Sequence, residues 1–190
     1  MAEHEAWMDD WQAMIDAVGT EFGGNVMAGA DDVDKSAIRR FQEPLEAGCP
    51  IHTDRDAALA AGFSDIVAPV ASFMMFQLPP MWKEGDAPIF TDGARNAEPA
   101  RSAVKPNMPS IAPPTTAYFA TDIDFEFLDD LVLGDHLTRR GNRLISCEPK
   151  RTAVGIGAFT KWEAEYVNQR GEVIGKIRTG LYHYNPHEVA

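Results

Sequence analysis

Residues 70–78 read Val-Ala-Ser-Phe-Met-Met-Phe-Gln-Leu, and Pro69 stands where it favours the first turn of a helix. The segment predicts a helix that is apolar on nearly every side. In a soluble protein such a helix must be covered by other structure all round. The nearly apolar run from Ile66 to Phe76 is too short to cross a bilayer at about 1.5 Å per residue.

The second half of the chain carries the pattern of β-structure. Strands are predicted over residues 118–127, 136–147, 152–167 and 173–184, with turns at 134–135, 148–151 and 168–171. Long strands joined by short turns favour an antiparallel meander. An arrangement that hides the helix at 70–78 is a strongly curved sheet wrapped around it. We therefore expect an α+β protein of the hot-dog type.

The first half predicts shorter elements. Apolar spacing indicates a helix over residues 5–18, Asp34 caps one over 35–43, and a third follows Thr53 or Asp54. Residues 22–28 are an expected edge strand. Residues 79–117 hold eight of the 13 prolines and show no periodicity, which is typical of a long loop. The expectation is one domain over residues 1–190, with an N-terminal helical extension at 1–19 and a proline-rich insertion at 79–117.

The charge balance limits the partners. With 29 acidic and 17 basic residues the formal net charge is −12, so we expect no general affinity for nucleic acid or for anionic membranes. The N-terminus lacks the pattern of a signal peptide. Cys49 and Cys147 are interpreted as reduced thiols, which favours the cytoplasm. The five histidines lack metal-site spacing, so no metal ion is expected.

One stretch carries a motif with chemical meaning. Residues 50–58 read Pro-Ile-His-Thr-Asp-Arg-Asp-Ala-Ala, and residues 133–137 read Leu-Gly-Asp-His-Leu. Together these resemble the MaoC-like acyl dehydratase and enoyl-CoA hydratase family, in particular its amino-terminal dehydratase-type domain. The resemblance covers residues 20–184. It implies a lyase that hydrates a trans-2-enoyl thioester, or dehydrates a 3-hydroxyacyl thioester, on CoA or acyl carrier protein.

The resemblance also implies a site. In the family the motif reads Gly-Asp-x-Asn-Pro-x-His; the Asp and His activate one water, and a backbone N–H at the start of the central helix stabilises the thioester oxyanion. Here the histidine falls on His52, but the aspartate position holds Ala47 and the glycine position Glu46. The asparagine position holds Cys49. The expected oxyanion donor falls on Pro69, which has no N–H, so Val70 is the candidate replacement.

These departures leave three interpretations open. The chain is one subunit of a heteromeric hydratase, and a second hot-dog chain supplies the Asp and His. Alternatively it is a homo-oligomeric hydratase that uses His52 with Glu46 or Glu43. Alternatively it is a non-catalytic acyl-CoA-binding module. An unrelated role for His52, as a hydrogen-bonded loop residue, also remains open.

The substrate side is less specific. The candidate substrate-binding residues are Cys49, Val70, Arg95, Arg101 and Lys105. The three basic residues can bind CoA phosphates, or they are solvated loop charges. No cofactor is expected, because hydration moves only protons and water. The acyl group stays open between fatty acids and ring-bearing chains such as steroid side chains, for which a long insertion can widen the tunnel. Open sheet edges tend to be covered, so a second hot-dog subunit or a homodimer partner is expected.

Overall fold

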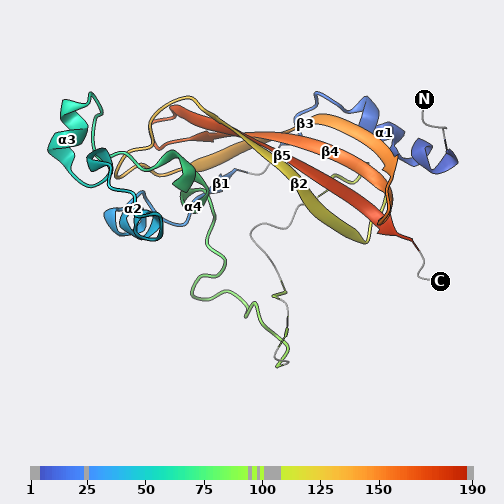
Figure 1. Cartoon of the computed structure of the whole chain (residues 1–190). Coiled ribbons are helices and arrows are strands. Elements are labelled where there is room, and N and C mark those ends of the chain that lie inside the picture. Colours follow the sequence, from blue (N-terminus) through green and yellow to red (C-terminus); the bar gives the residue numbers. More distant parts are fainter. Residues whose placement is uncertain (1–4, 24–25, 94–95, 98, 101–107, 188–190) are drawn as a thin grey trace.

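A long, curved antiparallel sheet forms the centre of the molecule (Figure 1). The computed structural model describes residues 5–23, 26–93, 96–97, 99–100 and 108–187. The sheet has five strands in the order β1-β3-β4-β5-β2. Its strands are β1 (Met27–Ala28), β2 (Ala117–Phe127), β3 (Thr138–Arg151), β4 (Gly155–Val167) and β5 (Val173–Pro186). The α+β hot-dog architecture is confirmed, and the expected edge strand forms as the two-residue β1.

The strands follow the predicted meander with one correction. The predicted turn at residues 148–151 is wrong, because β3 continues through it and Pro149 pairs with Ala158 of β4. The chain reverses at residues 152–154 instead. β1 pairs only with Thr138 and Arg139, and residues 19–22 form backbone bonds with β3 only at Asn142 and Leu144, so within the described residues no strand pairs with Pro149 on that side of β3. A proline is tolerated there because its missing N–H interrupts no ladder.

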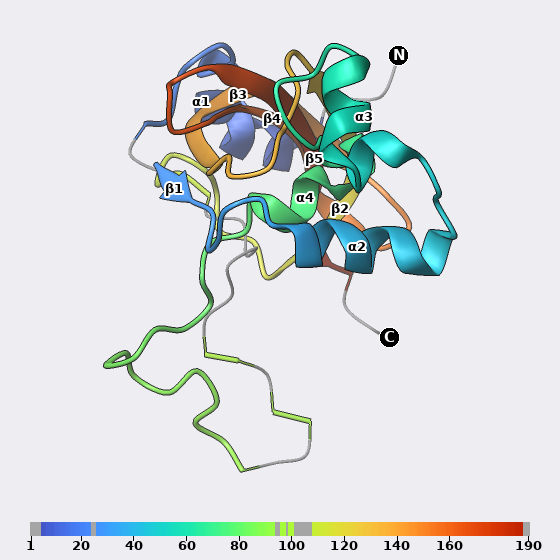
Figure 2. The ribbon, with the colours of Figure 1, turned by 90° about the vertical axis from the view of Figure 1, so that its left-hand side faces the viewer.

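Short helices flank the two ends of the sheet (Figure 1). Asp34 and Asp54 each cap a helix by accepting two backbone N–H bonds. The helical elements are η1 (Ala6–Trp11), α1 (Gln12–Asp16), α2 (Lys35–Gln42), η2 (Glu43–Leu45), η3 (Pro50–His52), α3 (Arg55–Ala60), η4 (Val70–Ser72) and α4 (Phe73–Phe76). Figure 2 shows α2, α3 and α4 together at one end of the sheet.

Two separate clusters cover the concave face of the sheet. At one end, Phe73 and Phe76 of α4 pack on Ala164, Tyr166 and Ile177. At the other end, the N-terminal extension buries Trp11 and Met14 against Trp162 and its neighbours. The extension therefore completes the core where the central helix does not reach.

The central helix is shorter than predicted, and one of its sides is open. η4 and α4 together span residues 70–76, so Gln77 and Leu78 lie outside the helix. Val70 is 61% exposed and Met75 is 44% exposed. The expectation that this helix is covered on every side is therefore wrong for the single chain.

The proline-rich segment leaves the body of the protein (Figure 1). Its described residues between 79 and 116 contain no helix or strand, as predicted. Arg95, Arg101 and Lys105, the basic residues proposed to bind CoA, lie outside the described residues.

Candidate functional site

The loop that carries His52 is fixed to the segment before the central helix. The amide of Val67 donates to the carbonyl of Ile51 at 3.2 Å, and His52 Nδ1 lies 2.6 Å from the carbonyl oxygen of Val67. A carbonyl can only accept, so Nδ1 carries the proton. In the neutral form of this half-buried ring the lone pair is then on Nε2, and this is the tautomer in which Nε2 can act as a general base.

The positions beside His52 in the motif do not replace the missing acid. The backbone amide of Ala47 donates to the carbonyl of Gln42 at 3.2 Å. The side-chain amide of Gln42 donates through Nε2 to the Ala47 carbonyl at 3.3 Å. Glu46 is exposed and takes a left-handed conformation, with φ of 50°. Among the described residues, no hydrogen bond or ion pair joins its carboxylate to His52. Cys49 is an exposed free thiol.

A short ladder places the start of the central helix beside the end of β2. Val67 forms an antiparallel bridge with Val132. The amide of Ala68 donates to Leu131, and the amide of Leu133 donates to Ile66, each at 2.8 Å. This register puts Pro69 opposite residue 130, directly after β2.

A pocket of about 280 Å³ opens at this junction. Its polar side chains are Asp129 and Asp130, and the rest of its wall is apolar apart from exposed backbone. The lining residues are Val67, Ala68, Pro69, Val70, Phe73, Phe127, Leu128, Asp129, Asp130, Leu131 and Ile174. The predicted candidate Val70 is therefore part of a pocket, and its N–H lies in the first helical turn, where no partner exists within the helix.

Asp130 has an electrostatic environment that differs from that of its neighbour. Partial burial, with the charge of Asp129 as a second cause, raises the pKa of the Asp130 carboxyl. Asp129 accepts a 2.8 Å bond from the Asp130 amide. Within the described part of the chain, the Asp130 carboxyl makes no hydrogen bond or ion pair. Residue 130 was missed from sequence, although two acids directly after a strand were a visible signal.

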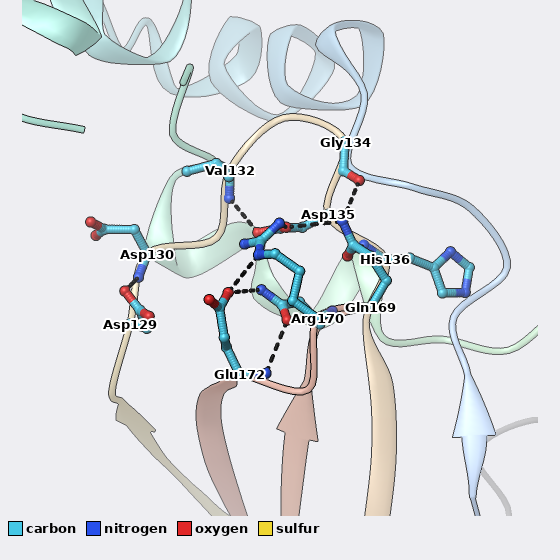
Figure 3. A network of polar contacts seen from close by, with 10 residues as sticks. Asp129, Asp130, Val132, Gly134, Asp135, His136, Gln169, Arg170 and Glu172 are labelled. Atoms are coloured by element: carbon cyan, nitrogen blue, oxygen red, sulfur yellow. Dashed lines mark hydrogen bonds and ion pairs between the residues drawn. The ribbon is translucent and has the colours of Figure 1, made fainter. Parts of the chain in front are cut away.

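Asp135 fixes the turn that carries this ladder (Figure 3). Its side chain is fully buried, accepts from the Val132 amide at 3.0 Å and pairs with Arg170 at 2.9 Å. Gln169 bridges the same turn by donating to the Gly134 carbonyl at 3.2 Å. The Gly-Asp pair thus ties the β4–β5 hairpin to the pocket wall, which agrees with a structural role.

Within the described ranges, no group of three or more His, Cys, Asp and Glu side chains is placed to hold a metal ion. No helix there has the length and hydrophobicity needed to span a membrane.

Comparisons with known proteins agree with the fold and with the family that the sequence resembles. Residues 16–177 match the family model described as "FAS1-like, dehydratase domain region". A probable enoyl-CoA hydratase alpha subunit from Thermomonospora curvata is 29% identical over 180 residues. That match covers 94% of this chain and 53% of the relative, so the chain spans about half the length of that protein.

Solved structures show the same architecture. The ChsH1-ChsH2 complex from Mycobacterium tuberculosis contains a chain that is 19% identical, with a TM-score of 0.65 and coverage of 96% of this chain and 99% of that one. A MaoC-like dehydratase is also 19% identical, with a TM-score of 0.52 over 89% of this chain and 42% of that one. At these identities the likeness shows the fold.

Proposed function

We propose, because the chain belongs to the family of FAS1-like dehydratase domain regions, that it is one hot-dog subunit of a heteromeric hydratase. The reaction is the addition of water to a trans-2-enoyl thioester, or its reversal. The relative from Thermomonospora curvata is named as an alpha subunit. The chain with the TM-score of 0.65 comes from a two-component complex.

The observation that carries this proposal is an incomplete motif in an intact fold. The Nδ1 proton of His52 leaves Nε2 suited to a base, but the position of its acidic partner is Ala47, and the exposed Glu46 forms no ion pair with His52 among the described residues. Water addition requires a group that holds and activates the water beside the base. A second subunit with an intact Asp and His supplies that site.

The open edge of the sheet is suited to such a subunit. β2 pairs only with β5, so its other edge has unpaired backbone groups over the described residues. On its concave side, Tyr118, Ile123, Phe125 and Phe127 are each at least 37% exposed. A long apolar edge strand is a surface that proteins usually pair or cover.

The substrate is an acyl thioester of CoA or of acyl carrier protein. The apolar wall of the pocket fits an acyl group, and the Val70 N–H at the helix start is the proposed oxyanion donor. The open side of the short central helix leaves room for a bulky acyl chain, including a ring-bearing one. The roles of Arg95, Arg101 and Lys105 in binding CoA, and of Cys49 beside the motif, stay predictions.

Purification from the native host tests the proposal. A tagged chain is expected to bring down a second hot-dog chain in equal amount. The complex is expected to remove the conjugated enoyl absorbance of a trans-2-enoyl-CoA, whereas the chain alone does not. Recovery of the chain alone, with full activity, would show that it is a self-sufficient hydratase.

The variant His52→Ala separates the remaining outcomes. In a self-sufficient enzyme the loss of the base is expected to lower kcat by about 100-fold or more. His187→Ala, at an exposed histidine near the C-terminus, is the control and keeps full activity. Tight acyl-CoA binding without turnover in any preparation would identify a binding module.

A further inference from the structure

The segment after the central helix forms an exposed arm. The arm comprises residues 79–93, which contain no helix or strand and are nearly all exposed. It runs away from the helices and the sheet (Figure 2). Its large apolar side chains Met81, Trp82 and Phe90 are 42%, 49% and 56% exposed. Apolar side chains of this size favour a position in which another surface covers them.

Trp82 is held in place by a turn of the arm itself. Its indole Nε1 donates to the Asp86 carbonyl at 3.2 Å, and the Asp86 carboxylate accepts from the Lys83 amide at 3.1 Å. The Asp86 amide donates to the Lys83 carbonyl at 3.0 Å. The polar end of the indole is thereby satisfied, while its apolar rings stay exposed. A tryptophan that is ordered before contact loses little freedom on binding, and such residues are typical anchors of protein interfaces.

The arm continues an apolar surface that begins on the central helix. Met75 and Leu78, which directly precede the arm, are both exposed. The proline-rich insertion that contains the arm leads from α4 to β2, where Ile123 and Phe125 are exposed on the concave side. The insertion is therefore joined at both ends to elements with uncovered apolar side chains. One of these elements, β2, carries the edge that the proposed function gives to a second subunit.

The accessible surface of the chain is larger than that of a compact monomer. Monomeric proteins of 20.9 kDa expose about 9,000 Å². This chain exposes 11,696 Å², an excess of about 2,700 Å². Obligate subunit interfaces bury about 1,000–2,500 Å² on each partner. The excess therefore has the size of a contact between subunits and is too large for one acyl chain to cover.

We propose that the arm binds the second hot-dog subunit, with Trp82 as its anchor. The inference rests on the proposed function, because it names the part of this chain that recognises the partner. Sheet edges present the same backbone groups in every hot-dog chain, so edge pairing alone discriminates little between partners. An arm outside the sheet adds side-chain contacts that only a matching surface can accept.

Dilution of the purified assembly tests this assignment. Assemblies with the tagged parent chain or with Trp82→Ala are purified from the native host, and mass photometry over a dilution series gives the Kd of the second hot-dog chain. Trp82→Ala is expected to raise this Kd by about 30-fold or more, as for a buried aromatic anchor. The matched control is Val154→Ala, at a 47% exposed apolar position between β3 and β4, and is expected to keep the parent Kd within about twofold.

Fluorescence quenching measures directly whether the partner covers Trp82. Of the four tryptophans, Trp7 is half-buried and Trp11 and Trp162 are buried, so Trp82 is the most exposed. The difference between the parent and Trp82→Phe isolates the emission of Trp82, and the tryptophans of the partner cancel. Acrylamide is expected to quench this emission in the isolated full chain and to quench it about fivefold less in the assembly, because interface anchors are desolvated.

Three results would overturn the inference: equal Kd values for the parent and Trp82→Ala, equal quenching of Trp82 in the chain and in the assembly, or recovery of this chain with only copies of itself. Turnover separates the inference from the proposed function. An assembly that hydrates a trans-2-enoyl-CoA but dissociates independently of Trp82 keeps the hydratase and removes the arm. An assembly that Trp82→Ala weakens, but that has no turnover, keeps the arm and contradicts the hydratase.

Discussion

At the scale of single residues, His183 shows how burial controls ionisation. The side chain is 3% exposed, its ring stacks on Tyr118 with 5.9 Å between ring centroids, and its Nε2 has no hydrogen-bond partner in the described structure. Burial lowers the pKa of His183 to about 4. An imidazole in water has a pKa of about 6.5. The folded protein therefore favours the neutral ring.

This difference predicts a loss of stability in mild acid. Between pH 6.5 and pH 4 the unfolded chain binds a proton at His183 that the folded chain does not, so the contribution of neutral His183 falls as pH falls through this window. His183→Phe, which keeps an aromatic ring beside Tyr118, is expected to weaken the pH dependence of Tm between pH 7.5 and pH 5. The control is His187→Phe, at an exposed position. An equal pH dependence in parent and His183→Phe would contradict the prediction.

At the scale of elements, the end of the central helix and the edge strand β1 meet through one glycine. The Gly29 amide donates to the Leu137 carbonyl at 2.8 Å, and the next amide, that of Ala30, donates to the Leu78 carbonyl at 2.8 Å. A Cβ on Gly29 would lie 2.2 Å from the carbonyl oxygen of Phe76. The close approach of two backbone segments explains why this position has no side chain.

Gly29→Ala is therefore expected to destabilise the protein. The helix end or β1 must move, which costs about 1–3 kcal/mol in the free energy of unfolding. Urea denaturation measures the change. Gly48→Ala is the matched control, because no atom lies within 4 Å of its Cβ position and the same loss of chain freedom applies. Equal stability of the two variants would show that the contact at Gly29 relaxes freely.

The two faces of β2 differ in polarity. On the convex side of β2, Asp122 and Asp124 pair with Lys161 at 2.8 and 2.5 Å. On the concave side, Ile123 is 45% exposed. The polar face is thus satisfied within this chain, whereas the apolar face is left for another molecule. Exposed ion pairs of this kind add little stability each, so their main effect is to define which face is polar.

At the scale of the whole molecule, β2 is the expected site of association. A charge at Ile123 is expected to separate the subunits, because burying an unpaired ammonium in an interface is strongly unfavourable. The measurement is size-exclusion chromatography with light scattering on the assembly purified from the native host. The assembly that contains Ile123→Lys is expected to have a lower mass than the assembly that contains the parent chain. Glu148→Lys, at an exposed position of β3, is the control and keeps the parent mass. An unchanged mass for Ile123→Lys would place the interface elsewhere.

The sequence by itself determined most of the elements and the family. Helix caps at Asp34 and Asp54, the turn at 168–171 and the alternation of β4 are local signals, because they depend on a few neighbouring residues. The motif around His52 identified the family for the same reason. Each of these signals is contained in a short stretch of chain.

The tertiary structure decided the features that depend on distant neighbours. Whether Pro149 ends a strand depends on what lies beside β3, and within the described residues the backbone bonds of β1 and of residues 19–22 to β3 end before Pro149. The exposed side of the central helix follows from how far the sheet and the N-terminal extension reach. The pocket wall formed by Asp130 depends on the pairing of Val67 with Val132, residues that are far apart in sequence. Sequence patterns cannot determine such positions, because packing and strand register fix them only after the chain has folded.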